Sequence, residues 1–437
     1  MTKLLTRMLL SGRIARLERL AGIYEQVVDP EVIAAEQLAR FNTQWDHAWR
    51  NIPFYRHWRT SHGIPDRIDR LDQLAAFPVL TKAALSEARE LVLRTPGSTR
   101  FSSTGGTTGA SMIFPMGSAD AETAWANTHL GRRWNGISPG DTLFMIWGHS
   151  HLFSGRAGRL KHVARQLKDQ LLGITRVSAY SLGPDELAEI YTLIRRTKPR
   201  YVIGYASSII QLCTYLQEQG KTLSDVGIHR VISTSEPLDP LDVPAVESIF
   251  GCPVANEYGM TEAGVIGYSV GGLFPIRIFW RDYTVHSEKN RLIVSTLGGR
   301  CFPLINYDTE DYCAEETPDN GTLLTLNALQ GRVFDIFAIR DRDGKLRPVS
   351  VVIFDHILKQ FPAVRTLHYA VTPAGEAVVS YTSADGPLPT EALQKHLVSG
   401  LAKDGIQVRQ GDVEFIWLSA PLQTAAGKRR ALTKGNF

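Results

Sequence analysis

The chain has 437 residues, of which 43% are hydrophobic and 21% are charged. These shares are usual for a soluble globular protein and exclude a chain that is disordered throughout. The length predicts at least two domains. Lys and Arg outnumber Asp and Glu by 48 to 44, a net charge of +4. Because no long basic run is present, nucleic acid is not an expected partner, and the small excess suits either an anion-binding enzyme or a random surface.

Cysteine spacing and hydropathy bear on the location of the chain. The four cysteines lack C-x-x-C spacing, so we expect reduced thiols in a cytoplasmic protein without a structural metal. No stretch reaches about 18 consecutive apolar residues, so no transmembrane segment is predicted. The first 20 residues combine leucines with four arginines. They predict a basic amphipathic helix that packs on the protein's own body or contacts a membrane surface.

The first predicted elements are helices. Residues 1–95 are expected to be mainly helical, with apolar and aromatic residues at helical spacing from Glu31 to Trp58. That pattern breaks near Gly63, and Thr81-Lys82 is typical of a helix start.

Short apolar runs then alternate with helical stretches over residues 96–270. We expect strands at 141–147, 200–206 and 229–237, and helices at 186–197 and 207–220. This alternation predicts an α/β sheet flanked by helices.

The pattern becomes β-rich after residue 270, with expected strands at 276–280, 283–286, 291–296, 303–307 and 323–327. After Gly331 it changes to shorter α and β units. We therefore expect a large N-terminal domain over 1–333, composed of a helical region (1–95), an α/β region (96–270) and a β-rich subdomain (271–333). A smaller α+β domain is expected over 334–437, a common domain size.

The sharpest local feature is the run 101–109, FSSTGGTTG. Three glycines and five hydroxyl residues make a poor helix or strand. They make a good anion cradle, because glycines let backbone N–H groups converge and hydroxyls donate to phosphate oxygens. No Lys follows Gly109, which excludes the usual P-loop pattern. By itself the run predicts a phosphate site or a mobile polar loop, and its candidate phosphate-binding residues are Ser103, Thr104, Gly105, Gly106, Thr107, Thr108 and Gly109.

This run resembles the ATP-phosphate motif of adenylate-forming enzymes, with Ala110 where the family often has Lys. Four further stretches resemble the motifs of that family, in the family's order. They are EYGMTE (257–262), PLINYDTED (303–311), GRVFD (331–335) and PLQTAAGK (421–428). Each match is weak alone, but five in order are strong.

Other stretches are similar to one branch of that superfamily, the phenylacetate–CoA ligase family, and most of all to its capsular-polysaccharide-associated members. They are 45–55, 77–82, 203–208 and 232–238. The resemblance covers nearly the whole chain. It implies the adenylate-forming fold, in which a large N-terminal core carries a small mobile C-terminal lid.

The resemblance implies a two-step reaction that uses ATP and Mg²⁺. A carboxylic acid attacks the α-phosphorus of ATP, pyrophosphate leaves, and the acyl-AMP passes its acyl group to CoA. A second reading keeps the acyl-AMP and uses an amine acceptor, which would form an amide in polysaccharide or secondary-metabolite biosynthesis. A third reading is a nucleotide-binding protein without catalysis. A homodimer is left open.

The resemblance also implies the roles of individual residues. Glu262 would hold Mg²⁺, a hard cation that favours carboxylate and phosphate oxygens. Thr261 would bond the α-phosphate, and Lys428 would neutralise charge shared by the attacking carboxylate and the α-phosphate. The other candidate nucleotide-binding residues are Ser235, Glu236, Pro237, Glu257, Tyr258, Gly259, Met260, Asp311 and Arg332.

The acyl pocket is expected where two strands end. Its candidate residues are Trp147, His149, His151, Tyr205 and Ser207. Their mixed polarity suggests an acid with hydroxyl or amide groups rather than a plain fatty acid. Each of them could equally serve packing. The two histidines lack an identifiable third ligand, so they predict no metal site.

Overall fold

The computed structural model describes the residues 10–103, 113–147, 168–179, 182, 184–313, 321–329, 331–332, 336–340, 346–350, 354, 357–358, 361, 363–371, 377–383, 386–403, 413–419 and 432–434. The chain divides into two compact units. Among the described residues, the first unit is formed by those up to Leu329 except Glu310–Tyr312, and the second by Glu310–Tyr312 together with those after Gln330. The domain boundary expected at 333–334 falls outside the described residues and stays a prediction.

The first unit begins with the expected helical region. Its helices are α2 (Ser11–Gln26), α3 (Pro30–Asn51), α4 (Pro53–His62), the 3₁₀ helix η1 (Leu71–Ala76), α5 (Lys82–Glu87) and α6 (Arg89–Leu93). Thr81 caps α5 by accepting a hydrogen bond from the Ala84 N–H at 3.1 Å. α4 ends at Gly63, which is left-handed with φ of 62°, at the predicted break.

The helical pattern expected from Glu31 to Trp58 is confirmed, and the structure divides it between two helices. Ile52 between them is extended, with φ of −99° and ψ of 119°. Proline disfavours the α conformation of the residue before it and fits the first turn of a new helix. Pro53 therefore ends α3 and begins α4.

Helix α2 overlaps the stretch 1–20 predicted to be basic and amphipathic, and continues six residues beyond it. Its residues Leu17, Ala21 and Tyr24 are at most 1% exposed. The Tyr24 ring packs against Trp134 and Trp280, at centroid distances of 5.7 and 5.3 Å. The apolar face of α2 therefore belongs to the core of the first unit.

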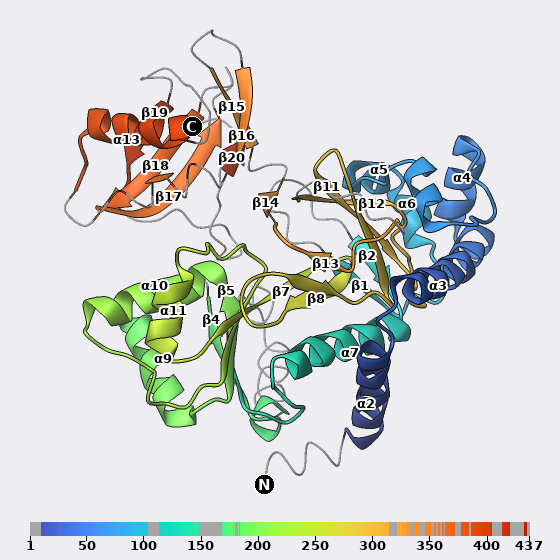
Figure 1. The fold of residues 1–437 in the computed structure, drawn as a ribbon, viewed down its shortest axis with the longest axis horizontal. Coiled ribbons are helices and arrows are strands. Elements are labelled where there is room, and N and C mark those ends of the chain that lie inside the picture. Colours follow the sequence, from blue (N-terminus) through green and yellow to red (C-terminus); the bar gives the residue numbers. More distant parts are fainter. Residues whose placement is uncertain are drawn as a thin grey trace, which may run out of the picture. The chain divides into compact units, whose positions relative to one another are not determined.

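An eight-stranded sheet forms the centre of the first unit (Figure 1), in the order β13-β9-β8-β7-β6-β5-β3-β4. The strands are β3 (Leu143–Trp147), β4 (Ile174–Ser178), β5 (Tyr201–Tyr205), β6 (Arg230–Thr234), β7 (Val254–Met260), β8 (Gly264–Ser269), β9 (Ile276–Ile278) and β13 (Thr325–Leu326). Strands β3 to β7 are mutually parallel. The pairs β7–β8, β8–β9 and β9–β13 are antiparallel.

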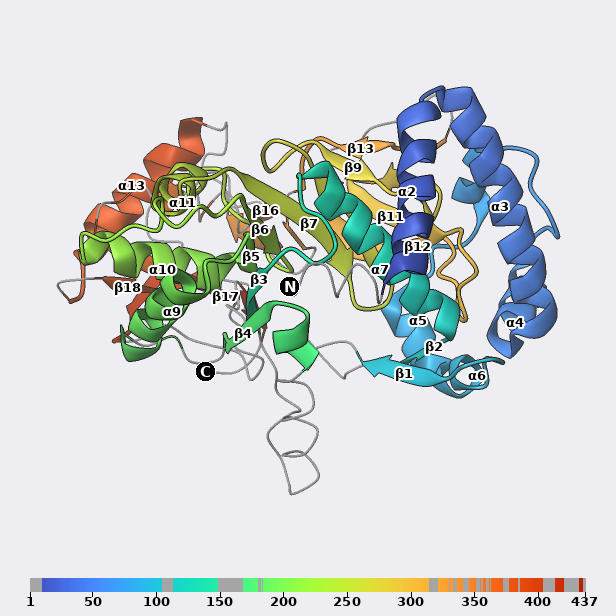
Figure 2. The same cartoon turned by 90° about the horizontal axis from the view of Figure 1, so that it is seen from below.

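Both faces of this sheet are buried. On β3, Phe144 and Ile146 pack with α9 (Pro184–Thr197), α10 (Ala206–Glu218) and α11 (Val243–Phe250). Leu143, which precedes Phe144 and so lies on the opposite face of the strand, enters the cluster that includes α2 and α7 (Ser118–Trp134). Figure 2 shows α9, α10 and α11 gathered beside the parallel strands, with α2 lying along α7. Continuous apolar strands are typical of parallel sheets covered by helices on both faces.

The alternation of strands and helices over 141–237 is confirmed, and the α/β fold class with it. A second sheet carries β10 (Tyr283–Glu288), β11 (Arg291–Thr296) and β12 (Tyr307–Tyr312) as consecutive strands. Ahead of the first sheet, β1 (Arg100–Ser103) and β2 (Ile113–Met116) form an antiparallel pair that brackets the glycine-rich run.

The strand expected at 303–307 is wrong, because only its last residue belongs to one. Asn306 has a left-handed backbone with φ of 50°, which interrupts an extended chain. Its side chain donates a hydrogen bond to the Phe77 carbonyl at 2.8 Å. This stretch is therefore a fixed bend that leads into β12.

The second unit is an α+β arrangement. Its elements are β14 (Gly331–Arg332), β15 (Ile336–Arg340), β16 (Leu346–Ser350), β17 (Val364–Val371), β18 (Ala377–Ser383), α13 (Thr390–Lys403), β19 (Val413–Trp417) and β20 (Leu432–Lys434). Its four-stranded sheet has the order β19-β18-β17-β20, and Leu393, Leu397 and Leu401 of α13 pack into its core. In the described part of the chain, no helix is long and apolar enough to cross a membrane.

Candidate functional site

The parallel strands of the large sheet all end at one edge. Because β3, β5, β6 and β7 are adjacent and parallel, their last residues meet there. Trp147 ends β3, Tyr205 ends β5, and Ser235 follows β6. Ligands of open α/β sheets bind at this edge, so the fold brings several of the predicted site residues together.

Two aromatic rings mark the β3–β5 end of this edge. The rings of Trp147 and Tyr205 lie 4.8 Å apart at an interplanar angle of 43°. Tyr205 is buried and Trp147 is half-buried. Ser207, also predicted for the substrate, lies in the first turn of α10 and is buried. His149 and His151 lie outside the described residues, so the structure describes only Trp147, Tyr205 and Ser207 of the residues predicted for the acyl pocket.

The turn after β6 carries a carboxylate to the start of α10. Ser235 is exposed and left-handed, with φ of 67°, a conformation that costs energy for a non-glycine residue. The Glu236 Oε2 accepts a hydrogen bond from the Ser207 backbone N–H at 2.9 Å. A carboxylate at a helix N-terminus is favoured by the helix dipole. Glu236 thus joins the ends of β5 and β6, and exposed Pro237 follows it.

The side chain of Glu257 on β7 is engaged within the protein. Its Oε1 accepts a hydrogen bond from the Thr234 hydroxyl at 3.0 Å, and its Oε2 accepts one from the Tyr268 hydroxyl. Burial, and next the negative charge of Glu257, raise the pKa of Tyr268 well above its ordinary value. Tyr268 therefore stays a donor, and both oxygens of the Glu257 carboxylate are occupied by hydrogen bonds within the sheet.

Gly259 stands where β7 and β8 come closest. The pairing slips by one residue between Tyr258 and Gly259. A Cβ on Gly259 would lie 2.5 Å from the Gly264 carbonyl oxygen and 2.9 Å from the Val265 Cα. The backbone that approaches Gly259 is therefore that of β8, and any side chain there would collide with main-chain atoms. Its neighbours Tyr258 and Met260 are half-buried.

The turn between β7 and β8 carries Thr261 and Glu262. Thr261 is exposed and Glu262 is half-buried. The Tyr307 hydroxyl donates a hydrogen bond to the Glu262 Oε1 at 3.0 Å. The next carbonyl, that of Ala263, accepts hydrogen bonds from the Tyr283 hydroxyl at 2.6 Å and from the Arg300 guanidinium. Both the side chain and the backbone of this turn are therefore held in place.

A magnesium ion fits the donor set of this turn. The described residues contain no group of three or more His, Cys, Asp or Glu side chains that could hold a metal. Mg²⁺ commonly takes one or two carboxylates, with substrate phosphates and waters as its other ligands. A fixed single carboxylate such as Glu262 matches that pattern, so the Mg²⁺ prediction stands.

The remaining predicted site residues belong to the β1–β2 hairpin, to the second unit or to stretches outside the described residues. Ser103 pairs with Ile113 in the β1–β2 hairpin, but the glycine-rich run from Thr104 to Gly109 is not described. In the second unit, Asp311 of β12 pairs with Arg332 of β14. Lys428 also lies outside the described residues, and its role stays a prediction.

Sequence reasoning missed the residues that hold the Thr261–Glu262 turn. Tyr307 stands inside the PLINYDTED stretch, so the motif gave a signal for it. Tyr283 and Arg300 lie in stretches with no motif, at 20 and 37 residues from the Ala263 carbonyl that they contact. Only the folded chain brings them to it.

Comparisons with known proteins show which proteins the chain is similar to. No protein-family model matches the chain. The phenylacetate–coenzyme A ligase of Aromatoleum evansii is 26% identical over 337 residues, which cover 70% of this chain and 72% of that protein. Protein CapK of Staphylococcus aureus is 21% identical over 280 residues, which cover 63% of this chain and 61% of that protein.

Solved structures are similar across both units. A 2-hydroxyisobutyryl-CoA ligase in the postadenylation state, in complex with R3-HIB-AMP, matches with a TM-score of 0.67 and 18% identity, over 91% of this chain and 89% of that one. An anthranilate CoA ligase in complex with anthranoyl-AMP matches with a TM-score of 0.53 and 15% identity, over 75% of this chain and 65% of that one. These likenesses show the fold of the chain.

Proposed function

Because the chain is an AMP-forming ligase of the adenylate-forming superfamily, related to the phenylacetate–CoA ligases and to protein CapK, we propose that it activates a carboxylic acid with ATP and transfers the acyl group to CoA. The observation that carries this proposal is the fixed Thr261–Glu262 turn. It follows β7, beside the edge where the parallel strands end, and the Glu262 carboxylate is oriented by Tyr307.

In the first step, a carboxylate oxygen of the acid attacks the α-phosphorus of ATP. The bond from that phosphorus to the bridging oxygen breaks, and pyrophosphate leaves with the bond's electrons. Glu262 would hold Mg²⁺, which supplies neutralisation of phosphate charge when it is bound. Thr261, exposed on the same turn, would donate a hydrogen bond to the α-phosphate. Lys428 would balance the charge shared by the two reacting groups.

In the second step, the sulfur of CoA attacks the carbonyl carbon of the acyl-AMP. The carbon–oxygen bond to AMP breaks, AMP leaves as the anion, and the thiol proton passes to solvent. The product is an acyl-CoA thioester. The 2-hydroxyisobutyryl-CoA ligase with the same fold has been solved with 2-HIB-AMP and CoA together, which supports CoA as the acceptor here.

For the acid, we propose a compact substrate with an aryl, hydroxyl or amide group. The Trp147 and Tyr205 rings, 4.8 Å apart, offer apolar faces, and the turn at Ser207 offers polar groups beside them. A pocket of this mixed character favours small functionalised acids over long plain chains.

An amine acceptor is the second candidate. The likeness to protein CapK, and the resemblance to capsular-polysaccharide-associated members, favour an acyl-AMP that is passed to an amine. A role in polysaccharide biosynthesis and a cytoplasmic location belong to the same proposal.

The test is acid-dependent exchange between ATP and labelled pyrophosphate, run over a panel of aryl, hydroxy, amido and plain fatty acids. At least one functionalised acid should support exchange, and mass spectrometry should detect its acyl-AMP. Adding CoA or amines to the active acid then separates the acceptors. No exchange with any acid would contradict acid activation and favour a protein that only binds nucleotide.

A further inference from the structure

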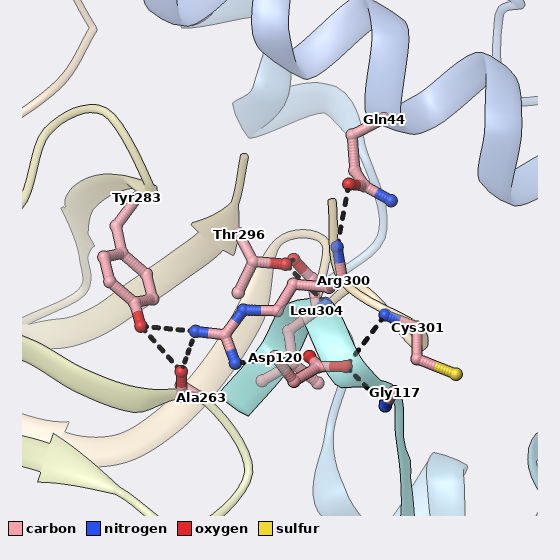
Figure 3. Close-up of polar contacts among 9 residues, drawn as sticks. All are labelled: Gln44, Gly117, Asp120, Ala263, Tyr283, Thr296, Arg300, Cys301 and Leu304. Carbon is pink, nitrogen blue, oxygen red and sulfur yellow. Dashed lines mark hydrogen bonds and ion pairs between the residues drawn. The ribbon is translucent and has the colours of Figure 1, made fainter. Parts of the chain in front are cut away.

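A buried ion pair lies behind the Thr261–Glu262 turn (Figure 3). Arg300 and Asp120 are 4% and 2% exposed, and the Arg300 Nη1 lies 3.5 Å from the Asp120 Oδ1. The desolvation penalty of such a pair offsets much of its attraction, so it is weak evidence for stability alone. The contacts that each partner makes give the pair another role.

The Arg300 side chain holds the backbone of the turn. Its Nη2 donates hydrogen bonds to the Ala263 carbonyl and, at 2.6 Å, to the Tyr283 hydroxyl. Tyr283 in turn donates to the same carbonyl at 2.6 Å. Ala263 is the residue directly after Glu262, so the Arg300 guanidinium fixes the peptide next to the proposed metal ligand.

The Asp120 side chain holds the strand that leaves the glycine-rich run. Its Oδ2 accepts hydrogen bonds from the Gly117 N–H at 2.7 Å and from the Cys301 N–H at 3.2 Å. Gly117 directly follows β2, and β2 is the first described element after the run. One carboxylate therefore ties the end of β2 to the loop that carries Arg300.

The protonation states needed for this chain of contacts are maintained. Burial alone would lower the pKa of the Arg300 guanidinium, but its interactions with Tyr283, Asp120 and Asp282 raise it overall. Burial raises the pKa of Tyr283 to about 12. At neutral pH, Arg300 is charged and Tyr283 is a neutral donor.

We propose that Arg300 and Asp120 are positioning residues for MgATP, which hold the Thr261–Glu262 turn and the strand leaving the glycine-rich run in one fixed relation. Strand β2 ends at Met116 and the turn begins at Thr261, 145 residues later in the sequence (261 − 116), and this pair sets their spacing. The inference rests on the proposed function, because that function assigns Mg²⁺ to Glu262 and the α-phosphate to Thr261.

The principal variant is Arg300→Met, which keeps much of the side-chain volume and removes every donor. In the ATP–pyrophosphate exchange assay, the KM for MgATP should rise about 10- to 100-fold, since small misplacements near reacting groups cost such factors. The KM for the acid should change less than about 2-fold, because Trp147 and Tyr205, the residues proposed to bind the acid, lie at the β3–β5 end of the edge. Arg300→Lys should recover part of the loss, since it restores charge without the planar fork.

Arg281→Met is the matched control. Arg281 pairs with Glu36 at 2.7 Å, and both side chains are half-buried. It lies in the same unit, and its side chain pairs with Glu36 rather than with the Ala263 carbonyl. This variant should keep the wild-type KM for MgATP, which separates loss of positioning from loss of any ion pair.

Hydrogen exchange of the peptide covering residues 254–269 gives a readout that needs no turnover. Arg300→Met should exchange faster there than wild type and Arg281→Met, while the peptide covering α10 exchanges alike in all three. If Arg300→Met does not fold, Tyr283→Phe removes one donor to Ala263 and keeps the ion pair, and it should show the same effects at smaller size.

The inference would be overturned if Arg300→Met folds and keeps both the wild-type KM for MgATP and the wild-type rate of hydrogen exchange over residues 254–269. Absence of pyrophosphate exchange in the wild-type protein would instead overturn the proposed function. The hydrogen-exchange comparison would then still decide whether Arg300 holds the turn.

Discussion

Glu262 illustrates, at the scale of a single residue, how a carboxylate is prepared for a role. A half-buried side chain on a turn would normally sample several rotamers, and each rotamer-rich side chain loses entropy when it is fixed. The Tyr307 hydroxyl fixes Glu262 from one side, and the bonds to Ala263 fix the backbone from another. The entropy of ordering the Glu262 side chain is therefore already lost in the folded protein, before any ligand binds.

Replacing Glu262 by Gln tests its charge. The amide oxygen can still accept the hydrogen bond from Tyr307, so the fold should be unchanged. Loss of a metal contact worth about 3 kcal/mol should lower exchange at subsaturating Mg²⁺ by about 100-fold. Titration of the exchange rate with Mg²⁺ measures this. Tyr307→Phe, which keeps the carboxylate and frees it, should give a smaller loss, and a wild-type Mg²⁺ dependence in Glu262→Gln would place the metal elsewhere.

At the scale of the element, the β7–β8 hairpin depends on one glycine. A Cβ at Gly259 would lie 2.5 Å from a main-chain oxygen of β8, and backbone cannot move aside as a flexible side chain does. Gly259→Ala should therefore lower the free energy of unfolding by about 1–3 kcal/mol. Chemical denaturation measures it.

Gly22→Ala is the control for that variant. Gly22 is inside α2, and a Cβ there would have no atom within 4 Å. Alanine has the higher helix propensity, so this change should be neutral or stabilising by about 1 kcal/mol or less. Equal unfolding free energies for the two variants would mean that the hairpin adjusts to a side chain at residue 259.

The elements that sequence predicted correctly are those with local causes. Thr81 and Gly63 supply a cap and a left-handed end, and alternating apolar runs supply the parallel strands. Local causes also explain where the structure departs from the simple pattern. Pro53 divides a helical pattern that looks continuous by spacing, and Asn306 bends a stretch whose apolar letters resemble a strand.

The candidate site was predicted only where a motif lay along the chain. The turn at Thr261–Glu262 and the strand-end residues such as Tyr205 follow from motifs and from strand order. The pair of Arg300 and Asp120 could not be predicted, because its members are 180 residues apart (300 − 120). Neither residue stands in a recognisable pattern, and only tertiary packing brings them together.

At the scale of the whole molecule, the second unit is expected to supply one residue to the chemistry. Lys428→Ala should abolish acid-dependent pyrophosphate exchange while leaving ATP binding mostly intact, because the lysine neutralises charge only as the bond to the α-phosphorus forms. Exchange assays and calorimetric ATP titration measure the two properties. Arg429→Ala removes a charge from the same run and should exchange normally, whereas unchanged exchange in Lys428→Ala would exclude the lysine from the reaction.

The stability of the whole chain should fall in mild acid. Burial lowers the pKa of His286 to about 4, against an ordinary value of 6.5 in the unfolded chain. Between these values the unfolded state binds a proton that the folded state does not, so the free energy of unfolding drops as pH falls from 6.5 toward 4. Denaturation at pH 7 and pH 4.5 measures it, and His286→Leu should lose about 1–2 kcal/mol less than wild type over that interval. Identical pH dependence in both proteins would show that this histidine is not held neutral.

The burial of α2 has a consequence for how the protein meets lipid. A helix that combines arginines with leucines could bind a membrane surface through its apolar face. In this protein, however, Leu17, Ala21 and Tyr24 are buried in the core of the first unit. A bilayer could capture this helix only by extracting those three side chains from their packing. Attachment through α2 and retention of the native fold are thus competing outcomes, and a vesicle that engaged the helix would act on the enzyme as a denaturant.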